Sequence, residues 1–355
     1  MRKPDKKNSF SKKLLKWHSK NARTFPWKET NDPYKIWLSE IILQQTQVVQ
    51  GLPYFLKIIK SFPTVQHLAK AKEDAVMKLW QGLGYYSRAR NLHSGAKHIA
   101  TELKGTFPSD YSGWLKVKGV GPYSAAAIVS FAYNQPHAVV DGNVFRVLAR
   151  CFGIKTPVDS AEGKKQFTLL ANELLDKKHA GIFNQAIMDL GATVCKPSSP
   201  DCDACPIKTD CVARKKNLIS VLPVKKKKTE LKKRFFHFII AKTKTGLLVE
   251  KRNASDIWKG LYQFPLIESK KFLTEKKLSE SELLKKISLT KRIQFTEVCE
   301  LVQLLSHQKI FAKFYLLNSG AKKCFPLEEK NTTQLKKTAL PKMLDSFIKN
   351  YSTLV

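Results

Sequence analysis

Two hydrophobic patterns follow one another along the chain. From about Ser9 to Lys216, apolar residues recur at helical spacing in blocks that short Gly, Pro and Asp signals separate, and no strand alternation interrupts them convincingly. Beyond a basic stretch the pattern changes, because the segments 234–250 and 295–317 are rich in Phe, Ile, Val and Leu and contain turn signals. The sequence therefore predicts a mainly helical domain followed by a smaller α+β domain.

One helical block carries an acidic residue. After the start signal Asn-Asp-Pro at 31–33, an apolar face that includes Trp37 and Ile41 predicts a helix over about 34–50. Glu40 lies inside this predicted helix.

The length of the chain agrees with two domains. Its 355 residues, of which 43% are hydrophobic, suffice for two cores, because a domain takes roughly 100–200 residues. The stretch Leu-Pro-Val followed by four lysines at 222–228 indicates a basic linker. We expect a first domain at 1–221, a linker at 222–233 and a second domain at 234–355, with a helix at about 270–286.

Charge favours a polyanionic partner. The chain has 63 Lys and Arg against 29 Asp and Glu, a formal net charge of +34, and nucleic acid is the first candidate. A lysine-rich bias on solvated faces would give the same charge, so both interpretations stay open. Residues 1–20 contain no apolar run of signal-peptide type, and the longest small and apolar stretch, 125–132, is too short to span a bilayer. We expect a cytoplasmic protein.

Four of the seven cysteines crowd into one segment, with the spacing Cys195-x6-Cys202-x2-Cys205-x5-Cys211. Crowded thiols in a reducing compartment indicate a metal site rather than disulfides. Zinc usually takes two Cys-x-x-Cys pairs, and only one is present, whereas an iron–sulfur cluster accepts uneven short spacings. An iron–sulfur cluster is favoured, with zinc as the alternative.

A glycine-rich turn lies in the middle of the helical domain. The segment 115–124 places Gly119 and Gly121 before a run of small and apolar residues, which predicts a helix–hairpin–helix. Glycine lets the backbone approach a ligand closely, and N–H groups at the start of the following helix can hold a phosphate oxygen of a duplex. A plain helix–helix turn would look similar.

Two carboxylates each have an ordinary interpretation. Asp141 stands directly before a helical pattern, where an aspartate serves as an N-cap. Taken alone, Glu40 would be interpreted as a solvated carboxylate on an amphipathic helix. However, Gln44, Gln45 and Thr46 add polar residues next to the apolar stripe. Polar residues in that position often line a cleft.

A set of motifs in a fixed order resembles one family, the MutY-type adenine DNA glycosylases of the endonuclease III superfamily. The motifs are those at 37–46, 81–88, 118–124, 140–150 and 183–191, followed by the four clustered cysteines. The resemblance covers nearly the whole chain. It implies a two-lobed helix–hairpin–helix glycosylase domain, a [4Fe-4S] cluster held by these cysteines, and a monomeric bacterial enzyme that binds double-stranded DNA.

The resemblance also implies the reaction. The substrate would be adenine paired with 8-oxoguanine or, less favourably, guanine, and hydrolysis of its glycosidic bond would prevent G:C to T:A transversions. Glu40 matches the general acid that protonates the flipped base, and Asp141 the carboxylate that stabilises or traps an oxocarbenium-like sugar. Tyr123 stands where bifunctional relatives carry a Schiff-base lysine, so we expect base removal without strand cleavage. Together with Asn143, it is expected to hold Asp141 and the sugar.

Further contacts follow from position within the same motifs. Gln185 and Trp27 are expected to contact the adenine. Gln45, Leu83 and Tyr85 match residues that wedge into the base stack, and the hairpin glycines are expected to contact the DNA backbone.

The second domain resembles a Nudix-like fold at 246–252 and 258–265. The segment 270–286 lacks the Arg-Glu-x-x-Glu-Glu pattern with which Nudix hydrolases bind cations, so the resemblance implies a domain that recognises 8-oxoguanine. Leu305-Ser306-His307 falls where the family usually carries Phe-Ser-His. Its serine and histidine are expected to contact the altered base, and an ordinary strand turn is the alternative.

Three other functions compete with this one. A bifunctional lyase acting on oxidised pyrimidines is disfavoured by Tyr123 and by the second domain. A non-catalytic DNA-binding iron–sulfur protein is disfavoured by two carboxylates at the family's positions. Nudix-type hydrolysis lacks its glutamates.

Overall fold

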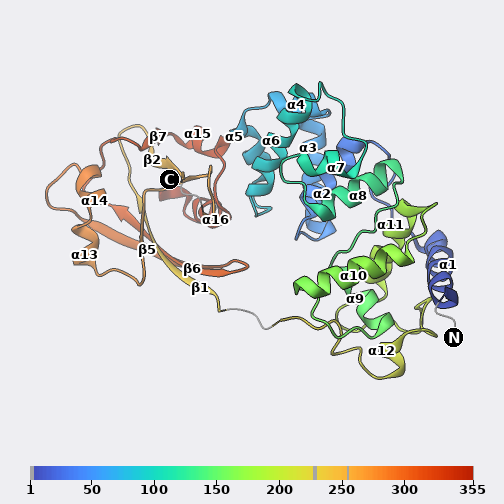
Figure 1. Ribbon diagram of the computed structural model, residues 1–355. Coiled ribbons are helices and arrows are strands. Elements are labelled where there is room, and N and C mark those ends of the chain that lie inside the picture. Colours follow the sequence, from blue (N-terminus) through green and yellow to red (C-terminus); the bar gives the residue numbers. More distant parts are fainter. Residues whose placement is uncertain (1–3, 227–229, 254–255, 355) are drawn as a thin grey trace. The chain divides into compact units, whose positions relative to one another are not determined.

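The computed structural model describes residues 4–226, 230–253 and 256–354, and the chain forms two compact units (Figure 1). The first holds residues 4–70 and 91–226, and the second holds 71–90 and the described residues from 230 onward. Segment 71–90, expected in the first domain, joins the second unit through contacts such as the hydrogen bond from Gln81 to Asp345 (2.8 Å). Residues 227–229 of the predicted linker lie outside the described residues.

The described part of the first unit is helical, as the hydrophobic pattern predicts. Its helices are α1 (Pro4–Asn21), α2 (Pro33–Leu43), α3 (Val48–Ser61), α4 (Val65–Lys70), α6 (Ser87–Thr101), α7 (Tyr111–Lys116), α8 (Pro122–Tyr133), α9 (Gly142–Phe152), α10 (Ala161–Leu174), α11 (Ala180–Thr193) and α12 (Val212–Lys215), with the first turn of α6 in the second unit. None of the helices in the described segments combines the length and apolar composition that a membrane crossing requires.

The single helix predicted over 34–50 is wrong. The side chain of Asp32 caps α2 by accepting from the Tyr34 amide at 2.9 Å, but α2 ends at Leu43 and α3 starts at Val48. Gln45, between them, has a φ of 55°, in the left-handed region. A right-handed helix cannot continue through that conformation.

The predicted helix–hairpin–helix is present. Helix α7 is capped by Asp110, and the chain turns through Gly119, whose φ is 84°, before α8 begins with Pro122 as its first residue. A Cβ on Gly119 would stand 2.6 Å from the Cβ of Asn91, so the turn requires glycine for both its conformation and its packing.

A shared apolar core holds α1, α9, α10 and α11 together, with Leu14, Val147 and Phe167 among its buried residues. Elsewhere in the same unit, Trp37 of α2 lies against Trp114 of α7 at a ring distance of 6.0 Å. The acidic residue expected on α2 and the aspartate before α9 therefore belong to helices fixed by extensive burial.

The second unit is built on a mixed sheet in the order β4-β1-β6-β5. Its strands are β1 (Lys232–Ile240), β4 (Leu266–Ser269), β5 (Phe295–Leu304) and β6 (Gln308–Leu317), and a smaller sheet joins β3 (Tyr262–Gln263), β2 (Leu247–Lys251) and β7 (Glu328–Lys330). β1 and β6 run parallel and side by side (Figure 1). β5 and β6 form an antiparallel hairpin. The predicted α+β class and the strand-rich segments are confirmed, and β1 begins two residues inside the predicted linker.

Helices cover both faces of the larger sheet. Leu284 and Ile287 of α14 (Glu282–Ile287) share a core with Ile239 and Tyr315, whereas Phe347 of α16 (Lys342–Asn350) stacks on Phe314 at 4.2 Å. The other helices of this unit are α5 (Glu73–Trp80), α13 (Glu275–Ser279) and α15 (Thr332–Lys337), with a 3-10 turn at Ser352–Leu354. The single helix predicted at 270–286 is wrong, because the side chain of Ser281 caps a separate start for α14.

Candidate active site

Glu40 is a buried carboxyl group on α2. Only 7% of the residue is exposed. Burial, assisted by the nearby charge of Asp141, raises the pKa of Glu40 to about 8. This group therefore holds a proton at neutral pH.

Asp141 caps α9, as the ordinary interpretation of its sequence position predicts. One carboxylate oxygen accepts from the backbone amides of Asn143 (2.9 Å) and Val144 (2.8 Å), and the other accepts from the Asn143 side chain at 2.8 Å. Burial raises the pKa of Asp141, and these hydrogen bonds together with the charge of Arg146 oppose that rise. The cap fixes the direction of the carboxylate and favours its charged form.

Tyr123 joins the two carboxyl groups at the start of α8. Burial raises the pKa of its hydroxyl well above the usual value, and the charges of Glu40 and Asp141 raise it further. The structure therefore brings together Glu40, Tyr123 and Asp141, although Glu40 precedes Tyr123 by 83 positions in the sequence. A hydrogen bond from Gln44 to Ser124 (3.0 Å) ties α2 to α8 beside them.

The other residues expected near the base lie on separate segments. Trp27 is buried and packs on Phe25 (ring distance 5.3 Å) and Phe55 (5.0 Å), and Gln185 is half-buried on α11. Gln45 is exposed in the break between α2 and α3.

Four predicted DNA contacts gather in the second unit. Leu83, Tyr85, Ser306 and His307 line one cavity of about 690 Å³, and the Tyr85 and Ser306 hydroxyls are hydrogen-bonded to each other. Cationic side chains from Arg90, Lys232, Arg234 and Lys342 also line it, together with Asp256, which is ion-paired with Arg234 at 2.7 Å. The cavity offers hydrogen-bonding groups and positive charge to an anionic ligand.

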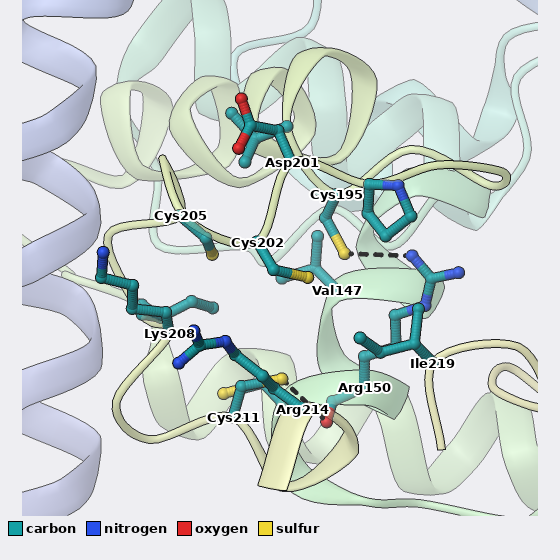
Figure 2. Close-up of a pocket in the computed structure, with 14 residues that line it drawn as sticks. Val147, Arg150, Cys195, Asp201, Cys202, Cys205, Lys208, Cys211, Arg214 and Ile219 are labelled. Atoms are coloured by element: carbon teal, nitrogen blue, oxygen red, sulfur yellow. Dashed lines mark hydrogen bonds between the residues drawn. The ribbon is translucent and has the colours of Figure 1, made fainter. Parts of the chain in front are cut away.

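The four clustered cysteines surround one space in the first unit (Figure 2). Burial raises the pKa of Cys202 and raises that of Cys205 to about 11, and the charges of the neighbouring cysteines add to both shifts. Arg150 donates to the sulfur of Cys195 at 3.5 Å and to the Lys196 carbonyl at 2.7 Å. In residues 4–226, 230–253 and 256–354, no three His, Cys, Asp or Glu side chains converge closely enough for a single metal ion.

Sequence reasoning assigned no role to two buried charged residues, Arg146 and Asp189. Arg146 donates to the Asn143 side chain at 2.8 Å and to the carbonyls of Gly191 (2.7 Å) and Cys195 (2.6 Å). Asp189 lies on α11 with no exposed surface. The only sequence signal for Arg146 was its position one helical turn after Asn143.

Comparison with known proteins gives a consistent result. Residues 38–173 match the family model of the HhH-GPD superfamily base excision DNA repair proteins. The adenine DNA glycosylase of Buchnera aphidicola subsp. Acyrthosiphon pisum is 36% identical over 76% of this chain and 79% of its own length. The adenine DNA glycosylase of Rattus norvegicus is 41% identical over 61% of this chain and 44% of its own length.

Solved structures match about three fifths of the chain. A thermostable thymine-DNA glycosylase superposes with a TM-score of 0.56 at 28% identity, over 60% of this chain and 98% of its own. Endonuclease III in a non-covalent complex with DNA has the same fold, with a TM-score of 0.53 at 20% identity over 61% of this chain and 99% of its own.

Proposed function

The chain belongs to the adenine DNA glycosylase family, and we propose that it removes adenine from A:8-oxoguanine and A:G pairs of duplex DNA by hydrolysis, without cutting the strand. The observation that carries this proposal is the grouping of Glu40, Tyr123 and Asp141, in which burial raises the pKa of Glu40 to about 8. One carboxyl is thereby kept as an acid, while the other is capped by hydrogen bonds that favour its anion.

The proposed general acid is Glu40. Adenine inside a duplex is out of reach, so the base must first leave the stack, which costs a few kcal/mol. An adenine anion is a poor leaving group, and Glu40, protonated at neutral pH, is suited to deliver a proton to N7 of the base as the glycosidic bond breaks.

The proposed partner of the sugar is Asp141. Positive charge develops at C1′ as adenine departs, and a fixed carboxylate stabilises it or forms a covalent bond to it before water attacks. Asn143 holds this carboxylate by its side chain and backbone amide. Tyr123, beside it, offers a hydroxyl and no amine, so no Schiff base forms at this position and the strand stays intact.

The second unit is the proposed reader of 8-oxoguanine. Its layered helix–sheet–helix architecture supports a Nudix-like assignment, and the hairpin residues Ser306 and His307 are exposed at the cationic cavity. The hairpin of Gly119 and Gly121, with Gln45, Leu83 and Tyr85, is proposed to hold and open the duplex.

We propose that the cysteine segment holds a [4Fe-4S] cluster. The donor set fits, since four thiols surround one space and influence each other's ionisation. A cubane takes one thiolate on each iron, so it does not require the tight convergence that a single zinc ion needs at ~2.3 Å from each sulfur. Its chemistry when bound would be electron transfer and rigid bracing of the loop. The monomeric state and the bacterial cytoplasmic location stay predictions.

The test is a single-turnover adenine-release assay on A:8-oxoguanine, A:G and A:T duplexes, each with and without alkali. We expect release from the first two only, with nicks appearing only after alkali. Nicks without alkali would instead favour a bifunctional lyase. The role of Ser306 and His307 is tested by measuring adenine release from A:8-oxoguanine and A:G in Ser306→Ala and His307→Ala. Equal losses of rate on both pairs would show that these residues do not recognise 8-oxoguanine.

A further inference from the structure

We propose that Asp189 is a positioning residue that fixes Trp27, and with it one wall of the adenine pocket. It acts through a cationic clamp, by which we mean the side chains of Arg23 and Lys28 that lie against the Phe25 ring. This inference rests on the proposed function, because Trp27 is expected to contact the base.

Asp189 is a fully buried carboxylate shared by three basic side chains. Arg23 donates to it from Nε (2.8 Å) and from its backbone amide (3.2 Å), Lys28 donates at 2.7 Å, and His18 lies at 3.3 Å. Burial alone would raise the pKa of Asp189, but the hydrogen bonds and charges of these groups outweigh burial and lower it. A buried charge with so many partners holds them in place, because losing it would leave cations unpaired.

The two cations held by Asp189 both contact Phe25. The Arg23 guanidinium lies 5.3 Å and the Lys28 ammonium 5.7 Å from the centre of the Phe25 ring. That ring stacks on Trp27 at 5.3 Å with an interplanar angle of 12°. Asp189 is thereby linked to Trp27 through two layers of side chains, first the cations Arg23 and Lys28 and then Phe25.

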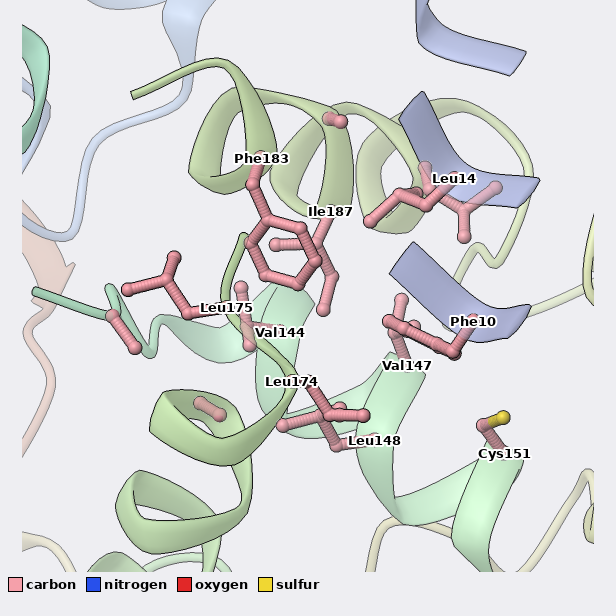
Figure 3. Packing of buried hydrophobic residues seen from close by; sticks show 14 of the residues in the cluster. Phe10, Leu14, Val144, Val147, Leu148, Cys151, Leu174, Leu175, Phe183 and Ile187 are labelled. Carbon is pink, nitrogen blue, oxygen red and sulfur yellow. The ribbon is translucent and has the colours of Figure 1, made fainter. Parts of the chain in front are cut away.

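Helix α11 gives this clamp a rigid base. Phe183 and Ile187 of α11 pack into the core with Val144 of α9 (Figure 3). Gln185, also expected to contact adenine, precedes Asp189 by four residues and so lies on the same side of the helix. Helix α11 therefore carries Gln185 itself and, through Asp189, determines the position of Trp27.

The first test needs no activity. In protein labelled with 5-fluorotryptophan, the resonance of Trp27 among the six tryptophans is assigned by its loss in Trp27→Phe. Asp189→Asn is expected to shift or broaden that resonance in the full-length protein, while the resonances of Trp80 and Trp258, which belong to the second unit, stay in place. Asp176→Asn serves as control, because Asp176 is also hydrogen-bonded next to the start of α11, at His179, but does not touch the clamp. An unchanged Trp27 resonance in Asp189→Asn would overturn the proposal even if the protein proved to have another substrate.

The second test asks whether Asp189 acts through Trp27. Asp189→Asn is expected to lower the single-turnover rate of adenine release about 10- to 100-fold, the scale of a small misplacement of a binding group. In a Trp27→Ala background the same change should cost little, because the two substitutions remove one interaction. If Asp189→Asn lowers the rate by the same factor with and without Trp27→Ala, Asp189 does not act through Trp27. Lys28→Met, which keeps the buried carboxylate and one strong cation, provides a milder variant if Asp189→Asn does not fold.

Discussion

Asn143 binds Asp141 twice, with its backbone amide on one carboxylate oxygen at 2.9 Å and its side-chain amide on the other at 2.8 Å. The two residues stand two positions apart at the start of α9, so a local helix cap also sets the direction of a half-buried acid. Arg146 completes the arrangement by donating to the side-chain oxygen of Asn143 at 2.8 Å.

Asn143→Ala should slow adenine release without preventing folding. The substitution removes the side-chain donor to Asp141 but leaves both backbone donors in place. A hydrogen bond to a charged group is worth about 1.5–3 kcal/mol, which corresponds to roughly a 10- to 100-fold loss in single-turnover rate. Asn21→Ala is the matched control, because that exposed amide donates to a carbonyl of its own helix. A wild-type rate for Asn143→Ala would exclude the orienting role.

The rate of adenine release should depend on a proton on Glu40. Because the raised pKa of Glu40 is about 8, most of the group is protonated below that pH. Well above it, the protonated fraction falls tenfold for each pH unit. A pH series of single-turnover rates is expected to be level near neutrality and to fall above about pH 8, and Glu40→Gln is expected to abolish release while duplex binding survives. Rates that keep rising above pH 9 would contradict the general-acid role.

The negative charge of Asp141 contributes to that raised pKa. Asp141→Asn removes this charge and should lower the pKa of Glu40, so any residual activity should begin to fall at a lower pH than in the parent protein. A fall at unchanged pH would mean that burial alone sets the pKa of Glu40.

Much of this architecture was readable from the sequence because it depends on local patterns. Helical spacing up to 216, the glycine turn at 115–124 and the strand-rich segments beyond 230 each reflect nearby residues. The break after α2 was missed because a left-handed Gln45 leaves no mark in an apolar pattern.

Local sequence patterns could not predict that Glu40 and Asp141 form one site, for a different physical reason. Asp141 forms the same cap whether or not a second carboxyl lies beside it, and the burial that raises the pKa of Glu40 comes from packing between distant segments. Arg146 and Asp189 escaped notice likewise, since a buried charge is recognised only once its partners are folded around it.

The two hairpin glycines should respond differently to alanine. Gly119→Ala places a side chain at a φ of 84° and against Asn91, so the free energy of unfolding should fall by at least about 1–2 kcal/mol. Gly121 has an ordinary φ of −98°, and a Cβ there meets nothing within 4 Å, so Gly121→Ala should keep its thermal stability. If a phosphate approaches this turn, Gly121→Ala should nevertheless weaken duplex binding in a fluorescence anisotropy titration. Unchanged affinity would remove Gly121 from the DNA interface.

Arg150 should determine how well the cysteine segment retains the proposed cluster. Its guanidinium donates to the Cys195 sulfur and to the carbonyls of Lys196, Pro197 (3.0 Å) and Leu222 (3.0 Å), while its own carbonyl accepts from the Cys211 thiol at 3.5 Å. A lysine cannot reproduce this forked set of donors.

Arg150→Lys is therefore expected to lower the iron and sulfide content per chain and to bleach faster in air, as followed by visible absorbance, while circular dichroism shows the helices intact. Arg292→Lys, at an exposed position of the second unit, is the control for a general effect of the substitution. Because three carbonyls and a sulfur lose their fixed donor together, the loop that carries Cys195 should loosen before the buried core of α9 does. Equal iron content in both variants would show that Arg150 does not hold the loop, and zinc in place of iron and sulfide in the parent protein would reject the cluster itself.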